Sequence, residues 1–158
     1  MKDKSRHRRM LINMRDIDKI IDAALLYLGY SGRAAVEFKI IDPVEMRKIN
    51  LKYRGQDKPT DVLSFPYLTL DSKAFDKAGY PNEYDGESGG VLLGSILICE
   101  EVAEKQAEEY GHGIKREMTY LFVHGLLHLL GFDHANDDDK QLMRNIEEEI
   151  ISRLLCLK

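Results

Sequence analysis

The sequence predicts an α+β domain in which about five helices cover a small mixed β-sheet of about four strands. Apolar residues recur at helical spacing in five segments, whereas shorter segments alternate or run apolar as strands do. The last three helical segments, from residue 100 onward, follow one another without an intervening strand. Strands mixed with helices and then helices alone are typical of the α+β class.

The first half of the chain is expected to alternate between strands and helices. Asp16 is a suitable N-cap for an amphipathic helix, and Asp42 followed by Pro43 is a favoured start for a second one. The expected elements are a short strand at 10–14, a helix at 16–30, a strand at 34–41 and a helix that begins at 42 and ends near 55.

The second half is expected to supply two more strands and three helices. Pro59 and Pro66 enclose the segment DVLSF, which suits a short strand between two residues that cannot donate a ladder hydrogen bond. Residues 67–90 contain four Gly, three Asp, one Asn and one Pro, which indicates a long loop. The later elements are a buried strand at 91–99 and helices at 100–111, 114–131 and 136–158.

Length and composition indicate a single domain that spans residues 1–158. Apolar residues make up 44 % of the chain and charged residues 32 %, with a net charge of −4, which suits a solvated globular domain. The longest apolar runs are too short to cross a bilayer, and no signal peptide is visible. The short apolar runs lead us to expect no membrane partner. Cys99 and Cys156 form no C-x-x-C pair, so we expect reduced thiols and a cytoplasmic location. The basic residues 1–9 are expected to form a disordered tail.

Three of the five histidines lie within the stretch HGLLHLLGFDH. His124 and His128 are four residues apart, so on a helix they share a face and can converge on one metal ion. Gly131 can adopt a left-handed conformation that ends this helix and returns His134 to the pair. Three neutral ligands leave one position for water, as in catalytic zinc sites. We therefore expect one Zn²⁺ on His124, His128 and His134, although imidazole also accepts other divalent transition metals.

The stretch has the histidine spacing and the internal glycine of the metzincin protease motif H-E-x-x-H-x-x-G-x-x-H, and it differs from that motif in one residue. Gly125 stands where the protease has its general-base glutamate. This difference argues against peptide hydrolysis unless an acidic residue of 67–90 takes that role. Gly125 itself either leaves room for a bulky substrate or permits close helix packing. His112 and Asp133 are weaker candidates, which either lie near the site or make only local hydrogen bonds.

Two stretches in order, NLKYRGQDKPTDVLSFP and HGLLHLLGFDH, resemble the YbeY family of bacterial rRNA-maturation endoribonucleases. The similarity extends through LLGSILIC, EVAEKQAEEYGH and KREMTYLFVHG, over most of residues 35–150. It implies that the three motif histidines bind zinc and that Arg54 is the functional arginine of the family. Members commonly have Gly-Asp where this chain has Gly94-Ser95, so this chain lacks that aspartate.

The resemblance implies a single-strand-specific, metal-dependent endoribonuclease that trims the 3′ end of small-subunit ribosomal RNA and takes part in ribosome quality control. The implied partners are RNA and the ribosome or its small subunit. Arg54 and His124 are the expected catalytic residues. The planar guanidinium of Arg54 suits a phosphate, and His124 is one of the expected metal ligands. Arg47 and Lys58 could extend a phosphate track. A metzincin-like metallopeptidase and a non-catalytic ribosome assembly factor with a structural metal remain alternatives.

Overall fold

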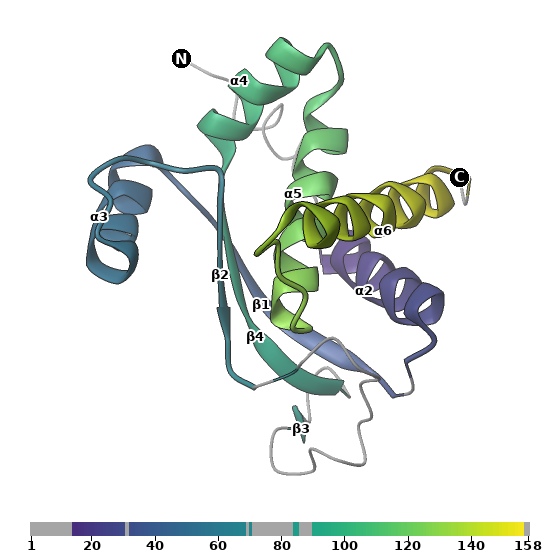
Figure 1. Cartoon of the computed structure of the whole chain (residues 1–158). Coiled ribbons are helices and arrows are strands. Elements are labelled where there is room, and N and C mark those ends of the chain that lie inside the picture. Colours follow the sequence, from purple (N-terminus) through teal and green to yellow (C-terminus); the bar gives the residue numbers. More distant parts are fainter. Residues whose placement is uncertain (1–13, 31, 69, 71–83, 86–89, 157–158) are drawn as a thin grey trace.

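A mixed four-stranded sheet forms the centre of the fold (Figure 1). The computed structural model describes residues 14–30, 32–68, 70, 84–85 and 90–156. The longest strand, β4 (Gly90–Cys99), has β1 (Ala34–Ile41) parallel to it along one edge. Along the other edge, β2 (Val62–Pro66) and β3 (Tyr84–Asp85) pair with it in antiparallel orientation.

Five helices lie around this sheet in the described part of the chain. They are α2 (Met14–Leu28), α3 (Pro43–Arg54), α4 (Glu100–Tyr110), α5 (Ile114–Leu129) and α6 (Asp137–Cys156). Helix α5 packs against β2 and β4, and α2 and α6 pack against α5 on the side away from the sheet (Figure 1). Among the described residues, no helix is both long and apolar enough to cross a membrane.

The main core lies between β4 and α5. The residues of β4 that belong to this core are Val91, Leu93, Ile96 and Ile98, all of them buried. Their alternation changes phase at Gly94, next to a register shift between β1 and β4. Phe122 and Leu126 of α5 are fully buried in the same cluster. Since each fully buried side chain of this kind contributes about 1.5–3 kcal/mol, this core fixes α5 firmly on the sheet.

Helix α3 lies on the opposite face of the sheet, and its two ends are well defined. Met46 packs there with Leu63 of β2 in a second, smaller core cluster. The Asp42 side chain accepts a hydrogen bond from the Glu45 backbone N–H at 2.8 Å, as expected for an N-cap. Gly55 ends the helix in the left-handed conformation, with φ 69°. These signals place Arg54 at the last position of α3.

The fold class and most of the expected elements are confirmed. The five helices and the strands expected at 34–41, 61–65 and 91–99 are present with small shifts at their ends. The strand expected at 10–14 is wrong at Met14, which begins α2, and residues 10–13 lie outside the described residues together with the tail at 1–9. The single domain over 1–158 stays a prediction.

The segment 67–90 contains a short strand where only a loop was expected. Strand β3 pairs with Gly90 and Val91 at the beginning of β4. Strand β2 is only five residues long and reaches no further than Gly94 along the same edge. The beginning of β4 therefore offers backbone hydrogen-bonding groups that β2 does not use, and β3 pairs with them. A two-residue strand leaves too little pattern in the sequence to be predicted.

Candidate metal centre

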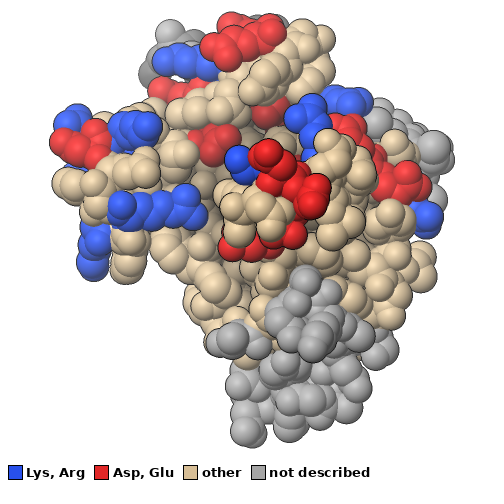
Figure 2. All heavy atoms as spheres, viewed as in Figure 1, with Lys and Arg blue, Asp and Glu red and all other residues tan. Residues whose placement is uncertain are grey.

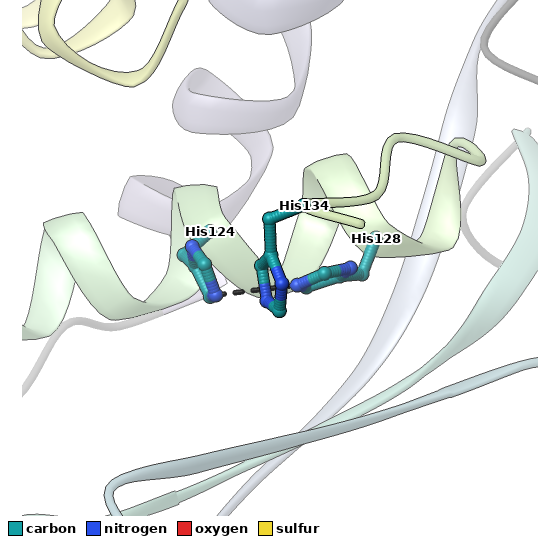
Figure 3. A group of neighbouring side chains, drawn as sticks. All are labelled: His124, His128 and His134. Carbon is teal, nitrogen blue, oxygen red and sulfur yellow. Dashed lines mark hydrogen bonds between the residues drawn. The ribbon is translucent and has the colours of Figure 1, made fainter. Parts of the chain in front are cut away.

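Helix α5 places His124 and His128 on one face, four residues apart. Their Nε2 atoms lie 3.2 Å from each other, and both side chains are half-buried (Figure 3). Two nitrogens that are both bound to one tetrahedral zinc at about 2.0–2.1 Å are separated by about 3.3–3.4 Å. The spacing of this pair therefore suits a shared metal ion.

The end of α5 returns the chain toward the same pair of rings. Gly131 has φ 95°, a left-handed conformation that favours glycine. The N–H of Phe132 donates to the carbonyl of Leu127, and the N–H of Gly131 donates to the carbonyl of His128, which is the Schellman pattern. His134 follows this turn, and its ring centroid lies 4.9 Å from that of His128 (Figure 3).

The three histidines together could hold a metal ion. One ring nitrogen from each lies within 4.8 Å of the other two, with His134 exposed and the other two half-buried. Burial lowers the pKa of His128, and the charges of His124 and His134 lower it further. A lowered pKa keeps this imidazole neutral, which is the form that binds a metal.

Hydrogen bonds to the other ring nitrogens direct the Nε2 atoms of the pair toward the metal position. The Nδ1 of His128 lies 3.0 Å from the carbonyl oxygen of Phe132. A carbonyl oxygen only accepts, so this Nδ1 donates and Nε2 keeps its lone pair. The Nδ1 of His124 donates in the same way to Oε1 of Glu147 at 3.1 Å. Two lone pairs that face each other at 3.2 Å require a cation or a proton between them, and the donor set fits a metal such as zinc.

The histidines open into a cavity of about 380 Å³ between α5, β2 and the end of α3. Its wall also includes Arg54, Asp61, Ser64 and Tyr120. Asp61 is held in place, because its carboxylate accepts hydrogen bonds from the Val62 N–H at 2.7 Å and from the Gln106 side chain at 3.3 Å. The cavity thus combines a candidate metal centre with a cation on the opposite wall.

Arg54 is the cation that the structure places in this cavity. Its side chain is exposed and forms no ion pair with any residue that the structure describes. The loop that follows it is fixed by Asn50, whose buried side chain donates to the carbonyl of Lys58 at 2.8 Å. Arg47 is instead bound to Asp57 at 2.7 Å, and neither Arg47 nor Lys58 is among the residues of the cavity wall.

Charge is distributed unevenly around the site. Figure 2 shows several Lys and Arg side chains over α3, with some acidic atoms among them, and a group of Asp and Glu side chains near the centre of the view, where α6 begins. The first turn of α6 contains Asp137, Asp138 and Asp139. Because like charges repel, a polyanion is expected to approach along α3 rather than along the start of α6.

Gly125 faces both the cavity and the sheet. A Cβ atom at this position would lie 3.2–3.3 Å from three side-chain atoms of Ile96 on β4. This distance is tighter than ordinary van der Waals contact, so the glycine permits close packing of α5 on β4. Gly125 also lines the cavity, so the structure is compatible with both expected roles of this glycine, close helix packing and room for a substrate. The position that carries the protease glutamate is closed here by Ile96.

The other sequence candidates take different places. Asp133 lines the cavity and accepts a hydrogen bond from the backbone N–H of His134 at 2.8 Å. His112 lies in the break between α4 and α5 and bonds to Glu117 at 2.9 Å, away from the metal cavity. Ser95 pairs within the sheet, opposite Glu37 and Phe65, and is not part of the cavity wall.

Sequence reasoning did not single out Glu147, although a signal was present. Glu147 is 3 % exposed and lies among the buried apolar residues of α6. It falls at the helical spacing of Met143 and Ile150, where an apolar residue is expected. A carboxylate within an apolar stripe is costly unless it has a partner, so its position alone indicates a function. Asp61, Ser64 and Tyr120 gave no such signal.

Comparison with known proteins identifies the family of this chain. A family model described as endoribonuclease YbeY matches residues 3–155. The chain belongs to the endoribonuclease YbeY family. An endoribonuclease YbeY of Thermoanaerobacter sp. is 40 % identical over 145 residues, which are 90 % of this chain and 89 % of the relative.

Two further relatives have the same name. The endoribonuclease YbeY of Heliobacterium modesticaldum is 39 % identical, covering 85 % of this chain and 79 % of its own. That of Clostridium botulinum strain Loch Maree is 42 % identical, covering 85 % and 84 %. A solution structure of a Thermotoga maritima protein has the same fold, with a TM-score of 0.57 and 24 % identity over 87 % of this chain and 78 % of its own.

Proposed function

We propose that this protein is a metal-dependent endoribonuclease that cleaves single-stranded RNA, with Zn²⁺ on His124, His128 and His134. The observation that carries the proposal is the pair of imidazole Nε2 atoms 3.2 Å apart, both with their Nδ1 atoms engaged. Membership of the endoribonuclease YbeY family supports RNA as the substrate.

The chain's own residues suit phosphodiester cleavage. When bound, the zinc supplies a Lewis acid and acidifies a water molecule. His124 and His128 present their Nε2 atoms to it, while Glu147 and the Phe132 carbonyl fix the orientation of the two rings. Cleavage of a phosphodiester develops negative charge on the nonbridging oxygens. Arg54, which has no ion-pair partner among the described residues, lies on the cavity wall and would offset that charge.

The nucleophile is either a metal-activated water or the 2′-hydroxyl of the ribose. A substrate with one 2′-deoxy nucleotide at the cleaved position distinguishes the two. Loss of cleavage, together with 2′,3′-cyclic phosphate ends on the unmodified RNA, selects the 2′-hydroxyl. Unchanged cleavage of the 2′-deoxy substrate selects the water.

In the cell, we propose that the substrate is the 3′ end of small-subunit ribosomal RNA, with a further role in ribosome quality control. The protein would then act in the cytoplasm and bind the ribosome or its small subunit. The resemblance of the two sequence stretches to the YbeY family supports this role. The basic side chains over α3 would face the RNA backbone, because most phosphate contacts in such interfaces come from Lys and Arg.

Metal analysis of the purified protein, combined with cleavage assays on single-stranded and hairpin RNA, tests the proposal. We expect about one zinc per chain and cleavage of the single strand only. In His128→Ala, zinc and cleavage should be lost together, whereas Gln141→Ala, an exposed change on α6, should keep both.

The two alternatives have distinct outcomes in the same experiment. Peptide hydrolysis by the zinc-loaded protein without RNA cleavage would favour a metallopeptidase. Binding of precursor small subunits that persists in a folded His128→Ala protein, together with no RNA cleavage by the wild type, would favour an assembly factor.

A further inference from the structure

A second cavity, of about 340 Å³, adjoins the metal cavity along α5. Its wall includes Tyr110, His112, Arg116, Tyr120, Arg144 and Glu148. Tyr120 belongs to the walls of both cavities, so the two hollows are neighbours. Its ring lies 6.2 Å from that of His124, and burial with the nearby charge of Glu147 raises the pKa of its phenol, which stays protonated.

The wall of the second cavity carries two arginines and two glutamates, and the two arginines are the groups that an anionic ligand would meet. Neither Arg116 nor Arg144 forms an ion pair within the part of the chain that the structure describes. Glu117 is buried and its carboxylate is bound to the ring of His112 at 2.9 Å, which leaves Glu148 as the exposed acid on the wall. Two guanidiniums that share a cavity and are unpaired among the described residues suit a phosphate group.

The start of α5 adds to this preference for an anion. The helix begins at Ile114, and its N-cap, Gly113, has no side chain that could satisfy the first backbone N–H groups. Arg116 lies in this first turn. The positive end of the helix dipole therefore lies beside Arg116, and the acid of the same turn, Glu117, is buried and bound to His112.

Aromatic surface lies at the same cavity. The side chain of Tyr110 is 65 % exposed although it ends α4 beside the cavity. Its ring lies 5.8 Å from the ring of His112. An exposed aromatic face beside cationic side chains is an arrangement on which unpaired bases stack in single-strand binding proteins.

The spacing along α5 relates the two cavities to one strand of RNA. Arg116, Tyr120 and His124 are successively four residues apart, so each step advances about 6 Å along the helix. Arg116 is thus about 12 Å from His124 along the axis of α5, which is about three to four nucleotides at a stacking distance of about 3.4 Å.

We infer that the second cavity is a subsite for the substrate strand, where Arg116 and Arg144 bind a phosphate about three to four nucleotides from the cleaved bond and Tyr110 stacks on a base. The inference rests on the proposed RNA cleavage. A free nucleotide offers the same phosphate and base, so the experiment must separate it from the RNA strand.

Cleavage rates on a nested series of single-stranded RNAs test this subsite. The series keeps one mapped cleavage position and is shortened by one nucleotide at a time from each end. We expect Arg116→Ala and Arg144→Ala to lower kcat/KM about tenfold or more on long RNA, because each removes a charged contact. On RNAs too short to reach the second cavity, both variants should match the wild type.

Lys115→Ala is the matched control, since it removes one positive charge from the adjacent residue, which is not part of the cavity wall. It should change kcat/KM little at every length. A uniform loss at all lengths in Arg116→Ala, or no loss at any length, would overturn the subsite. Competition by a nucleoside monophosphate that depends on Arg116, without any dependence on RNA length, would assign the cavity to a free nucleotide instead.

Binding measurements keep this test separate from the proposed cleavage. Binding of labelled RNAs to the His128→Ala protein can be measured by fluorescence anisotropy, and this measurement does not depend on cleavage. If the wild type cleaves no RNA, the proposed function fails, yet the subsite is still supported if Arg116→Ala weakens binding of long RNAs alone. If the His128→Ala protein binds long RNA equally well with and without Arg116→Ala, the subsite is rejected, even if the wild type cleaves RNA.

Discussion

Glu147 on α6 accepts a hydrogen bond from Nδ1 of His124 on α5 at 3.1 Å. A helix that supplies none of the three candidate ligands therefore orients one of them. The contact is buried, since Glu147 is 3 % exposed. It fixes the tautomer in which Nε2 of His124 faces His128, and it links metal binding to the packing of α6 on α5.

Removing the charge of Glu147 should weaken zinc binding. In Glu147→Gln the side chain keeps its size, but the imidazole loses its anionic partner, and we expect zinc affinity to fall by about tenfold to a hundredfold. Competition with a chromophoric chelator measures this affinity. Glu149→Gln, an exposed change in the same helix, should leave it unaltered. Equal affinity of Glu147→Gln and wild type would remove Glu147 from the metal centre.

Arg54 should matter for cleavage and not for the metal. We expect Arg54→Ala to keep its zinc and to lower kcat/KM on RNA by tenfold or more, which corresponds to a charged contact of about 1.5–3 kcal/mol. Arg153→Ala is the control, because that guanidinium lies on α6, is already paired with Glu149, and is not part of the cavity wall. Loss of zinc from Arg54→Ala, or unimpaired cleavage, would show that the role is assigned wrongly.

Gly131 should be needed for both folding and metal binding. A side chain at φ 95° is strained, so we expect Gly131→Ala to lower the free energy of unfolding by about 1 kcal/mol or more. Gly29→Ala introduces similar strain at φ 73°, directly after α2, which supplies none of the histidines. Thermal unfolding with and without zinc separates the effects. Only Gly131→Ala should also reduce the rise in Tm on adding zinc, because His134 follows this turn, and an equal rise in both variants would contradict this.

The histidine cluster could be predicted because its parts are local in the sequence. His124 and His128 are related by one helical turn, and Gly131 permits the turn that brings back His134. Both relationships depend on the backbone within one short segment. Helix starts such as Asp42 were predictable for the same reason, since a cap involves only its neighbours.

Contacts between distant segments could not be predicted in this way. Nothing in the spacing of the sequence places Arg54 opposite α5, and only the family resemblance indicated it. Arg54 and the histidines line one cavity because α3 and α5 both pack against β2, which forms a wall of that cavity. The bond between Glu147 and His124 likewise depends on how α6 packs, and β3 exists only because β2 is shorter than β4.

Gly125 offers a test of how closely α5 must approach the sheet. In Gly125→Ala the helix gains about 1 kcal/mol of intrinsic propensity, but the new Cβ would lie 3.2–3.3 Å from Ile96. Overpacking of this kind costs about 1–3 kcal/mol, so we expect a net loss in the free energy of unfolding. When Ile96→Ala makes room, the same glycine substitution should cost less or become stabilising. A double-mutant cycle by urea denaturation should therefore give a coupling of at least about 0.5 kcal/mol. Strict additivity would mean that Ile96 does not restrict this position, and a glutamate at residue 125 would then have to be considered sterically acceptable.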